Sequence, residues 1–173
     1  MKIMIKQILT LAPLLLLINT AFAAQGQSCS GYIPDKTPVS RYIVDTDKGT
    51  VTDTETGLMW QQCSLGLSGV NCTTGSATIL NWQAALNAGP ISSAGGFSDW
   101  RLPNRNELLS IVALNCANPS VNQAVFPNTQ PAFGYWSSSP NADRNDHAWY
   151  VSFNEGDGNY RPRNQSRYVR LVR

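Results

Sequence analysis

The stretch GGFSDWRLPNRNELLSIV, residues 95–112, predicts that an extended segment passes directly into a helix. Pro103 keeps the residue before it extended, and Asn104 is a favourable N-cap. Glu107, three residues later, can bond back to the amide of Asn104, which is a variant of the capping box. The apolar residues that follow recur at helical spacing. The stretch therefore predicts a short amphipathic helix after Asn104.

Arg101 lies at this strand–helix junction, within a few residues of Asp99 and Glu107. Its guanidinium can stack on a tryptophan ring and pair bidentately with a carboxylate. An arginine that is buried without a partner is very costly, so we expect Arg101 and Glu107 to have structural roles. Large aromatic side chains usually fill the core, and this is the role we expect for Trp60, Trp82, Trp100 and Trp136.

Residues 1–23 have the layout of a secretory signal peptide, with two lysines, a short apolar run and a final Ala-Phe-Ala. A retained N-terminal anchor is the alternative. No later segment is apolar enough to span a membrane. We divide the chain into the signal peptide, an entry segment at 24–40 and a single domain at 41–173. The predicted location is secreted, periplasmic or at the surface of a bacterial cell.

The charge of the chain excludes one class of partner. Removal of the predicted signal peptide, with Lys2 and Lys6, leaves 11 basic and 11 acidic residues. A formally neutral chain argues against non-specific binding of nucleic acid. Residues 161–173 hold five arginines and no acid, a patch that could attract an anion or consist in good part of solvated strand residues.

Four cysteines in an exported chain predict two disulfides. The spacing favours a local Cys63–Cys72 bridge across a Gly/Ser-rich loop and a second bridge, Cys29–Cys116, although three pairings are possible. We predict no metal site and no cofactor, because the chain has no CxxC spacing and only one histidine, His147.

The remaining patterns predict an α+β domain. Residues 41–63 read as a three-stranded meander, and 78–89 contain a short helix that stops at Gly89-Pro90. The last forty residues look all-β, with strands at 135–139 and 147–154, a turn at 154–159 and a final strand at 168–173. Alternation places Trp149, Val151 and Phe153 on one face, and turns Val169 and Leu171 inward.

Six ordered motifs resemble a known family. GTVTDTETGLMWQQ, NWQAAL, GGFSDWRLPNRNELLSIV, YWSSS, AWYVSFNEGDGN and VRLVR together look like the C-terminal domain of the Legionella collagen-like adhesin, a family also known as DUF1566. The resemblance runs from about Arg41 to Arg173. It implies a C-type-lectin-like fold, with two short helices packed on a twisted, mostly antiparallel sheet, and a role in adhesion. The WRLPNRNE element is also distantly similar to formylglycine-generating enzymes.

Two departures from relatives of this fold limit what the resemblance implies. The chain lacks the collagen-like Gly-X-Y repeats of the adhesin, so trimerisation is not expected to follow. It also lacks the EPN and QPD triplets of calcium-dependent lectins, so calcium is not predicted.

The polar stretch at 141–165 is the candidate binding region. Amides and guanidinium groups supply directional hydrogen bonds, and a tyrosine ring offers a stiff stacking surface, which together suit a sugar. The candidate ligand-binding residues are Asn141, Arg144, Asn145, Asp146, His147, Asn154, Asn159, Tyr160, Arg161 and Arg163. Turn formation alone could also explain the asparagines and aspartates among them.

The sequence thus predicts a non-enzymatic module that binds an extracellular polysaccharide or a surface protein. One lone histidine among loop serines is no triad signature. The acidic pairs Asp143/Asp146 and Glu155/Asp157 are only nominal candidates for a glycosidase couple. Two alternatives stay open: an enzyme acting on cell-envelope glycans, and a structural subunit of a surface assembly.

Overall fold

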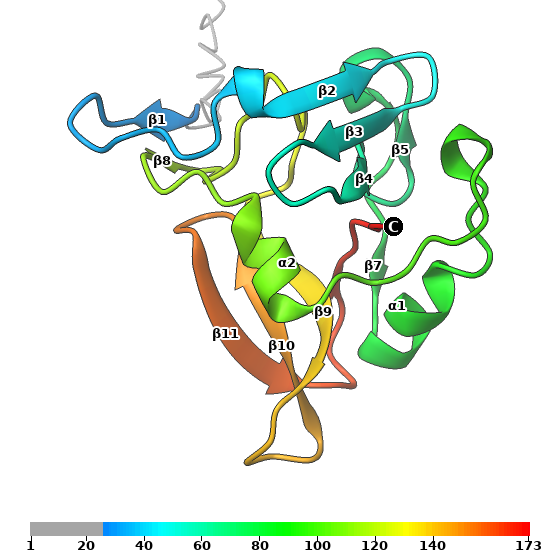
Figure 1. Ribbon diagram of the computed structural model, residues 1–173. Helices are drawn as coiled ribbons and strands as arrows, with labels where there is room; N and C mark the ends of the chain where they lie inside the picture. The colour runs from blue at the N-terminus through cyan, green and yellow to red at the C-terminus, as the bar shows by residue number, and fades with distance from the viewer. Residues whose placement is uncertain (1–25) are drawn as a thin grey trace, which may run out of the picture.

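The computed structural model describes residues 26–173, so the predicted signal peptide lies outside the described residues (Figure 1). The described part contains two α-helices, α1 (Trp82–Ala88) and α2 (Arg105–Ser110). Its longer strands are β2 (Tyr42–Asp45), β3 (Thr50–Asp53), β4 (Met59–Gln61), β9 (Tyr135–Pro140), β10 (His147–Ser152) and β11 (Asp157–Pro162). Two-residue strands complete the set: β1 (Ser28–Cys29), β5 (Leu67–Ser68), β6 (Thr74–Gly75), β7 (Ile79–Leu80), β8 (Cys116–Ala117) and β12 (Arg167–Tyr168).

The main sheet has five strands in the order β11-β10-β9-β12-β7. All its neighbours are antiparallel except β12 and β9, which pair in parallel. The predicted meander forms a separate three-stranded sheet, β2-β3-β4. Figure 1 shows α2 lying across the β9–β10 face of the main sheet, while α1 lies near β7. The fold is therefore α+β with a mostly antiparallel, curled sheet and two helices, as predicted.

Two hydrophobic clusters hold these layers together. The first lies between the meander and α2 and includes Val51, Trp60, Leu108 and Phe153, all fully buried. The second packs α1 against the main sheet and includes Ala85, Trp100, Leu102, Trp136 and Leu171. Trp82 is only half-buried and packs against the second cluster.

The C-terminal segment joins the two sheets. Its backbone bonds to β4 through Met59, Gln61 and Arg173, and to the strand–helix junction through a reciprocal pair between Arg101 and Val172, with N–O distances of 2.9 Å. Val169 and Leu171 face inward, as alternation predicts, and both are fully buried. The segment beyond β12 thus runs between two layers instead of extending one sheet.

Gly89, the C-cap of α1, lies very close to another part of the chain. A Cβ at this position would lie 2.3 Å from the carbonyl oxygen of Trp100. The glycine lets the end of α1 touch the backbone of the junction, so it does more than stop a helix.

Two disulfides staple the loops, as predicted. They join Cys29 to Cys116, 87 residues apart, and Cys63 to Cys72, nine residues apart. Within residues 26–173, neither helix has the length or the apolar run that a membrane span needs.

Two expectations about the C-terminal part were wrong. Residues 157–159 were expected in a turn, but they begin β11, which pairs with β10 over six residues. A final strand was expected at 168–173, but β12 covers only Arg167–Tyr168. For the arginine patch both solvation and anion binding were left open, and its members Arg167 and Arg170 are 7% and 0% exposed. Both turn inward because β12 and the segment after it are enclosed by neighbouring strands on each side.

Candidate ligand-binding site

The β10–β11 hairpin sorts the candidate residues onto two opposite faces. Trp149 is paired with Tyr160, and the next pair along the hairpin is Tyr150 with Asn159. Because successive side chains of a strand point to opposite sides, His147, Trp149 and Tyr160 share the face on which α2 lies. Asn159 and Arg161 point to the other face, with Tyr150. The ten predicted residues therefore do not form one cluster.

The α2 side carries a row of aromatic rings, which we call the aromatic row: His147, Trp149 and Tyr160. The ring centroids of Trp149 and Tyr160 are 5.4 Å apart and those of His147 and Tyr160 are 5.8 Å apart, both edge-to-face. All three side chains are partly exposed, and none belongs to either hydrophobic cluster. The aromatic row therefore contributes aromatic surface that is not packed into either hydrophobic cluster.

Two arginines flank the aromatic row. The guanidinium of Arg105, in the first turn of α2, lies 3.9 Å from the centroid of the Trp149 ring, and that of Arg144 lies 5.8 Å from the Tyr160 ring. Arg105 can cross the hairpin because Gly158 has no side chain: a Cβ there would sit 3.1 Å from Arg105 Nε. The stacked cations hold the rings in place, and Nε of Arg105 is buried without a hydrogen-bond partner among the described residues.

A shallow hollow of about 370 Å³ adjoins Trp149 at the start of α2. Its polar groups come from residues of the capped helix end and from the end of β9. The lining residues are Asn104, Arg105, Asn106, Glu107, Ser139, Pro140 and Trp149. Ser139 Oγ accepts a hydrogen bond from the amide of Arg105, at 3.0 Å, which fixes the helix start against β9. The hollow places amides, a hydroxyl and a guanidinium beside an aromatic face.

The junction residues hold this end of α2 in place. Arg101 donates two hydrogen bonds to Glu107, at 2.7 and 2.8 Å. Glu107 also accepts from the amide of Asn104, while Asn104 accepts from that of Glu107, which completes the capping box. The bonds from Arg101 lower the pKa of the Glu107 carboxyl. Arg101 is about half exposed and fixes the helix by this pair.

Several candidate residues are engaged in the local structure. Asn141 is buried, and its side-chain oxygen accepts from the amides of Asp143 and Arg144. Arg163 donates to the carbonyl of His147 and stacks over the Trp82 ring at 4.3 Å. These contacts hold the ends of β10 and β11.

Asp146, Asn145 and Asn154 lie in exposed turns. Asp146 Oδ1 is 2.7 Å from His147 Nδ1, and this hydrogen bond lowers the pKa of the Asp146 carboxyl. The pair orients the His147 ring at one end of the aromatic row.

Trp149, Arg105 and Asn106 were missed as candidate site residues. Alternation placed Trp149 on the same face as Val151 and Phe153, and this is correct. However, α2 spans only six residues and leaves the Trp149 end of that face partly uncovered. The Trp149 ring lies beside the first turn of α2, so the polar residues of that turn, Arg105 and Asn106, were the available signal.

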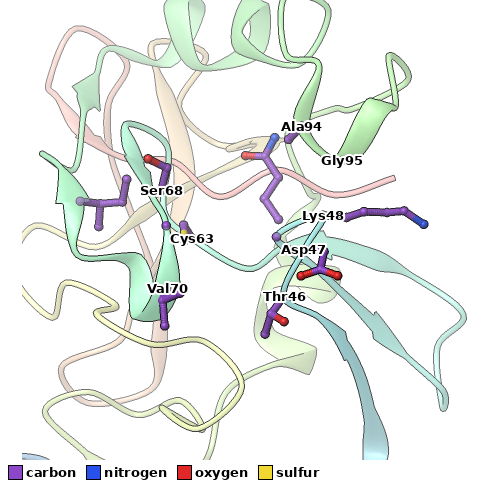
Figure 2. A pocket seen from close by; sticks show the side chains of 12 residues that line it. Thr46, Asp47, Lys48, Cys63, Ser68, Val70, Ala94 and Gly95 are labelled. Carbon is purple, nitrogen blue, oxygen red and sulfur yellow. The ribbon is translucent and has the colours of Figure 1, made fainter.

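A different hollow, of about 360 Å³, lies between the β2–β3 turn and the loop closed by the Cys63–Cys72 disulfide (Figure 2). Thr46, Asp47 and Lys48 line one side, and Ala94 and Gly95 approach from a third segment. None of the ten candidate residues lines it.

The nominal acid pairs do not face a common hollow. Asp143, Asp146, Glu155 and Asp157 are all exposed and lie in or beside turns. Within the described part of the chain, no group of three or more His, Cys, Asp or Glu side chains is arranged to hold a metal ion.

Comparison with known proteins places this geometry in a family. No curated protein shows significant similarity to the chain. The family model of the Lcl C-terminal domain, an adhesin domain, matches residues 49–173, which include both helices, the main sheet and the aromatic row. The chain belongs to the Lcl C-terminal domain family.

Proposed function

We propose that this chain is a non-catalytic adhesion module that binds an extracellular polysaccharide across the aromatic row. The observation that carries the proposal is that Trp149, Tyr160 and His147 stay partly exposed beside a polar hollow and outside both cores. Large aromatic side chains seldom remain at a surface without a partner.

The chemistry of the row suits a sugar chain. A pyranose ring presents a C–H face that can lie on an indole or phenol ring, and hydroxyl groups around its edge. Asn106 and Ser139 can donate to and accept from such hydroxyls, and Arg105 can donate. The hollow is shallow, which fits a polymer that passes across the surface.

The structure also supports an extracytoplasmic location. Two disulfides close the loops, and disulfides persist in oxidising compartments outside the cytoplasm. We propose that the mature domain is secreted, periplasmic or displayed at the bacterial surface, where polysaccharides are available. A surface protein is the second candidate ligand, because exposed Tyr and Trp also anchor protein interfaces.

Retention of the purified protein on a glycan array tests the proposal. We expect Trp149→Ala and Tyr160→Ala each to weaken binding by about tenfold or more, since a central aromatic anchor contributes at least about 1.4 kcal/mol. Tyr32→Ala is the matched control, because Tyr32 is fully exposed and far from the hairpin in sequence. A thermal melt of each variant checks that the fold is intact.

Three results would contradict the proposal. One is unchanged retention of both folded variants, which would remove the aromatic row as the binding face. Another is shortening of the bound glycan by the wild type, lost in Asp146→Ala or His147→Ala, which would favour the enzyme. The third is stable co-purification with one envelope protein and no retention on glycans, which would favour a structural subunit.

A further inference from the structure

Arg167, on the face of the main sheet opposite the aromatic row, is a buried cation without a counter-ion. It is 7% exposed, and no carboxylate among residues 26–173 forms an ion pair with it. Its Nη1 donates to the carbonyl of Phe133, its Nη2 has only a 3.4 Å contact with Gln165, and its Nε has no hydrogen-bond partner. A cation in this setting is strongly under-compensated.

A second arginine approaches the same aromatic ring. The guanidinium of Arg167 lies 3.7 Å from the centroid of the Tyr150 ring, and that of Arg161 lies 6.0 Å from it. Burial lowers the pKa of Arg167, and the charge of Arg161 lowers it further. Two like charges therefore approach one ring, and an anion in contact with Arg167 would offset the charge of the buried arginine.

Arg167 faces a hollow of about 440 Å³, within the size range of small-molecule sites. Tyr150 forms part of the wall, while Ser152 and Asn154 supply polar groups. The full lining is Asn118, Pro131, Ala132, Phe133, Gly134, Tyr150, Ser152, Asn154 and Arg167.

Phe133 makes the rim unusual. Its side chain is 63% exposed, and its backbone has a φ of 63°, a left-handed conformation that bulky residues rarely adopt. Such strain persists where the surrounding structure holds it, and it is concentrated at ligand sites. Here it turns the Phe133 carbonyl toward Arg167 and leaves the ring at the edge of the hollow.

Arg170 shows what a purely structural buried arginine looks like in this protein. It is fully buried and donates to the carbonyls of Gln61 and Gln62 and to the hydroxyls of Thr129 and Ser64. Among the described residues Nε lacks a hydrogen-bond partner in both arginines, but the other nitrogens of Arg167 have fewer partners and Arg167 faces a hollow. This difference indicates a structural role for Arg170 and a ligand-binding role for Arg167.

We propose that this hollow is a second binding site, which takes the carboxylate of an acidic sugar. Arg167 holds the carboxylate, Ser152 and Asn154 meet the ring hydroxyls, and the exposed Phe133 ring covers a C–H face. The need for an anion follows from Arg167 alone, whereas the choice of a sugar rests on the proposed function. The domain would then contact a glycan at two faces of one sheet.

Calorimetric titration of the purified protein with sodium glucuronate tests this site, with glucose as the neutral match and sodium sulfate as a plain anion. We expect glucuronate to bind, sulfate to bind more weakly because it meets Arg167 alone, and glucose to show no measurable binding. Arg167→Gln should weaken it by roughly 30-fold or more. If that variant does not fold, Asn154→Asp serves instead: Asn154 is exposed, and a negative charge at the hollow should weaken binding by about tenfold.

Matched variants separate this site from the aromatic row. Arg144→Gln removes an equal charge beside Tyr160 and should leave glucuronate binding unchanged, as should Trp149→Ala. The acidic-sugar site would be overturned if sulfate or glucose bound as tightly as glucuronate. It would also be overturned if Arg144→Gln weakened glucuronate binding as much as Arg167→Gln does. If Trp149→Ala weakened glucuronate binding and Asn154→Asp did not, glucuronate would be assigned to the aromatic row. That result would overturn the second site and leave the proposed function in place.

Discussion

At the scale of single residues, Arg170 ties the C-terminal segment to β4. Its guanidinium bonds two consecutive carbonyls, at Gln61 and Gln62, and lies 4.8 Å from the centroid of the Phe126 ring. Complete burial lowers its pKa, and its partners within residues 26–173 are neutral oxygens and aromatic faces. The planar fork of an arginine can reach several oxygens at once, which a lysine cannot do.

Replacement of Arg170 by lysine should therefore destabilise the fold. We expect Arg170→Lys to lower the free energy of unfolding by about 3 kcal/mol, because at least one charge-assisted bond is lost while the charge stays buried. Urea denaturation measures this change. Arg144→Lys, at an exposed position, should change the free energy by less than about 0.5 kcal/mol. Equal stability of the two variants would contradict the role of Arg170.

The sequence could not distinguish the buried arginines from the exposed ones. Arg161, Arg167 and Arg170 all lie in one short, polar stretch, and each is compatible with a solvated strand. Their burial depends on Tyr150, Phe126 and β4, which are distant in sequence. By contrast, the partner of Arg101 was predictable, because Glu107 lies six residues away and is fixed by the helix cap.

At the scale of elements, α2 depends on its first turn. The helix has only six residues, which is too few to be stable alone. Its capping box and the Arg101–Glu107 pair therefore contribute more to its stability than the helix propensities of its residues. Together they fix the helix end whose residues line the hollow beside Trp149.

This dependence predicts an effect of pH. The folded-state pKa of Glu107 is lowered, chiefly by Arg101, so its charge stabilises the fold above the usual Glu pKa of about 4.3. This contribution disappears as the pH falls through the lowered folded pKa. Glu107→Gln keeps the cap but removes the charge. The substitution should lower the free energy of unfolding by about 0.5–1 kcal/mol at pH 7. It should have no effect at a pH where Glu107 is protonated in both the folded and the unfolded protein.

Urea denaturation from pH 7 to pH 2.5 measures the gap, that is, the difference in the free energy of unfolding between wild type and variant. Glu155→Gln is the control, since Glu155 is exposed and makes no ion pair within residues 26–173. A gap for Glu107→Gln that stays constant on acidification would show that the charge of Glu107 is not what stabilises the helix.

Most elements were predictable because their signals are local. The helix caps at Asn81 and Asn104 and the turns of the β2–β3–β4 meander lie within a few residues of the elements they define. β11 was missed because the Asp, Gly and Asn residues of its first half favour turns. Pairing with β10 overrides that preference, and a single sequence does not reveal it.

At the scale of the whole molecule, a stiff scaffold displays two faces of one hairpin. The C-terminal segment bonds to β4 on one side and to the Arg101 junction on the other, and the two disulfides fix the loops around it. The sequence proposed a binding region at 141–165, and the structure places most of these residues in β10, β11 and the turns beside them. The division of this region between two faces was not predicted, because it depends on the unrecognised β11.

The five tryptophan indole groups allow the most direct test of the binding face. The indole N–H groups of Trp82, Trp100 and Trp136 donate to backbone carbonyls, and Trp60 is fully buried. Trp149 is the fifth, and it lines the hollow at the aromatic row. An oligosaccharide that binds this row must therefore change the environment of Trp149 far more than that of the other four.

The measurement is an NMR titration of the indole N–H resonances with oligosaccharides cut from a polysaccharide that the array retains. We predict that the Trp149 resonance shifts with the saturation of binding, that the other four stay in place, and that the oligosaccharide is recovered at its original length. A saturable interaction that leaves the Trp149 resonance unmoved, or an oligosaccharide that is shortened, would contradict the claim that the aromatic row binds glycan without chemistry.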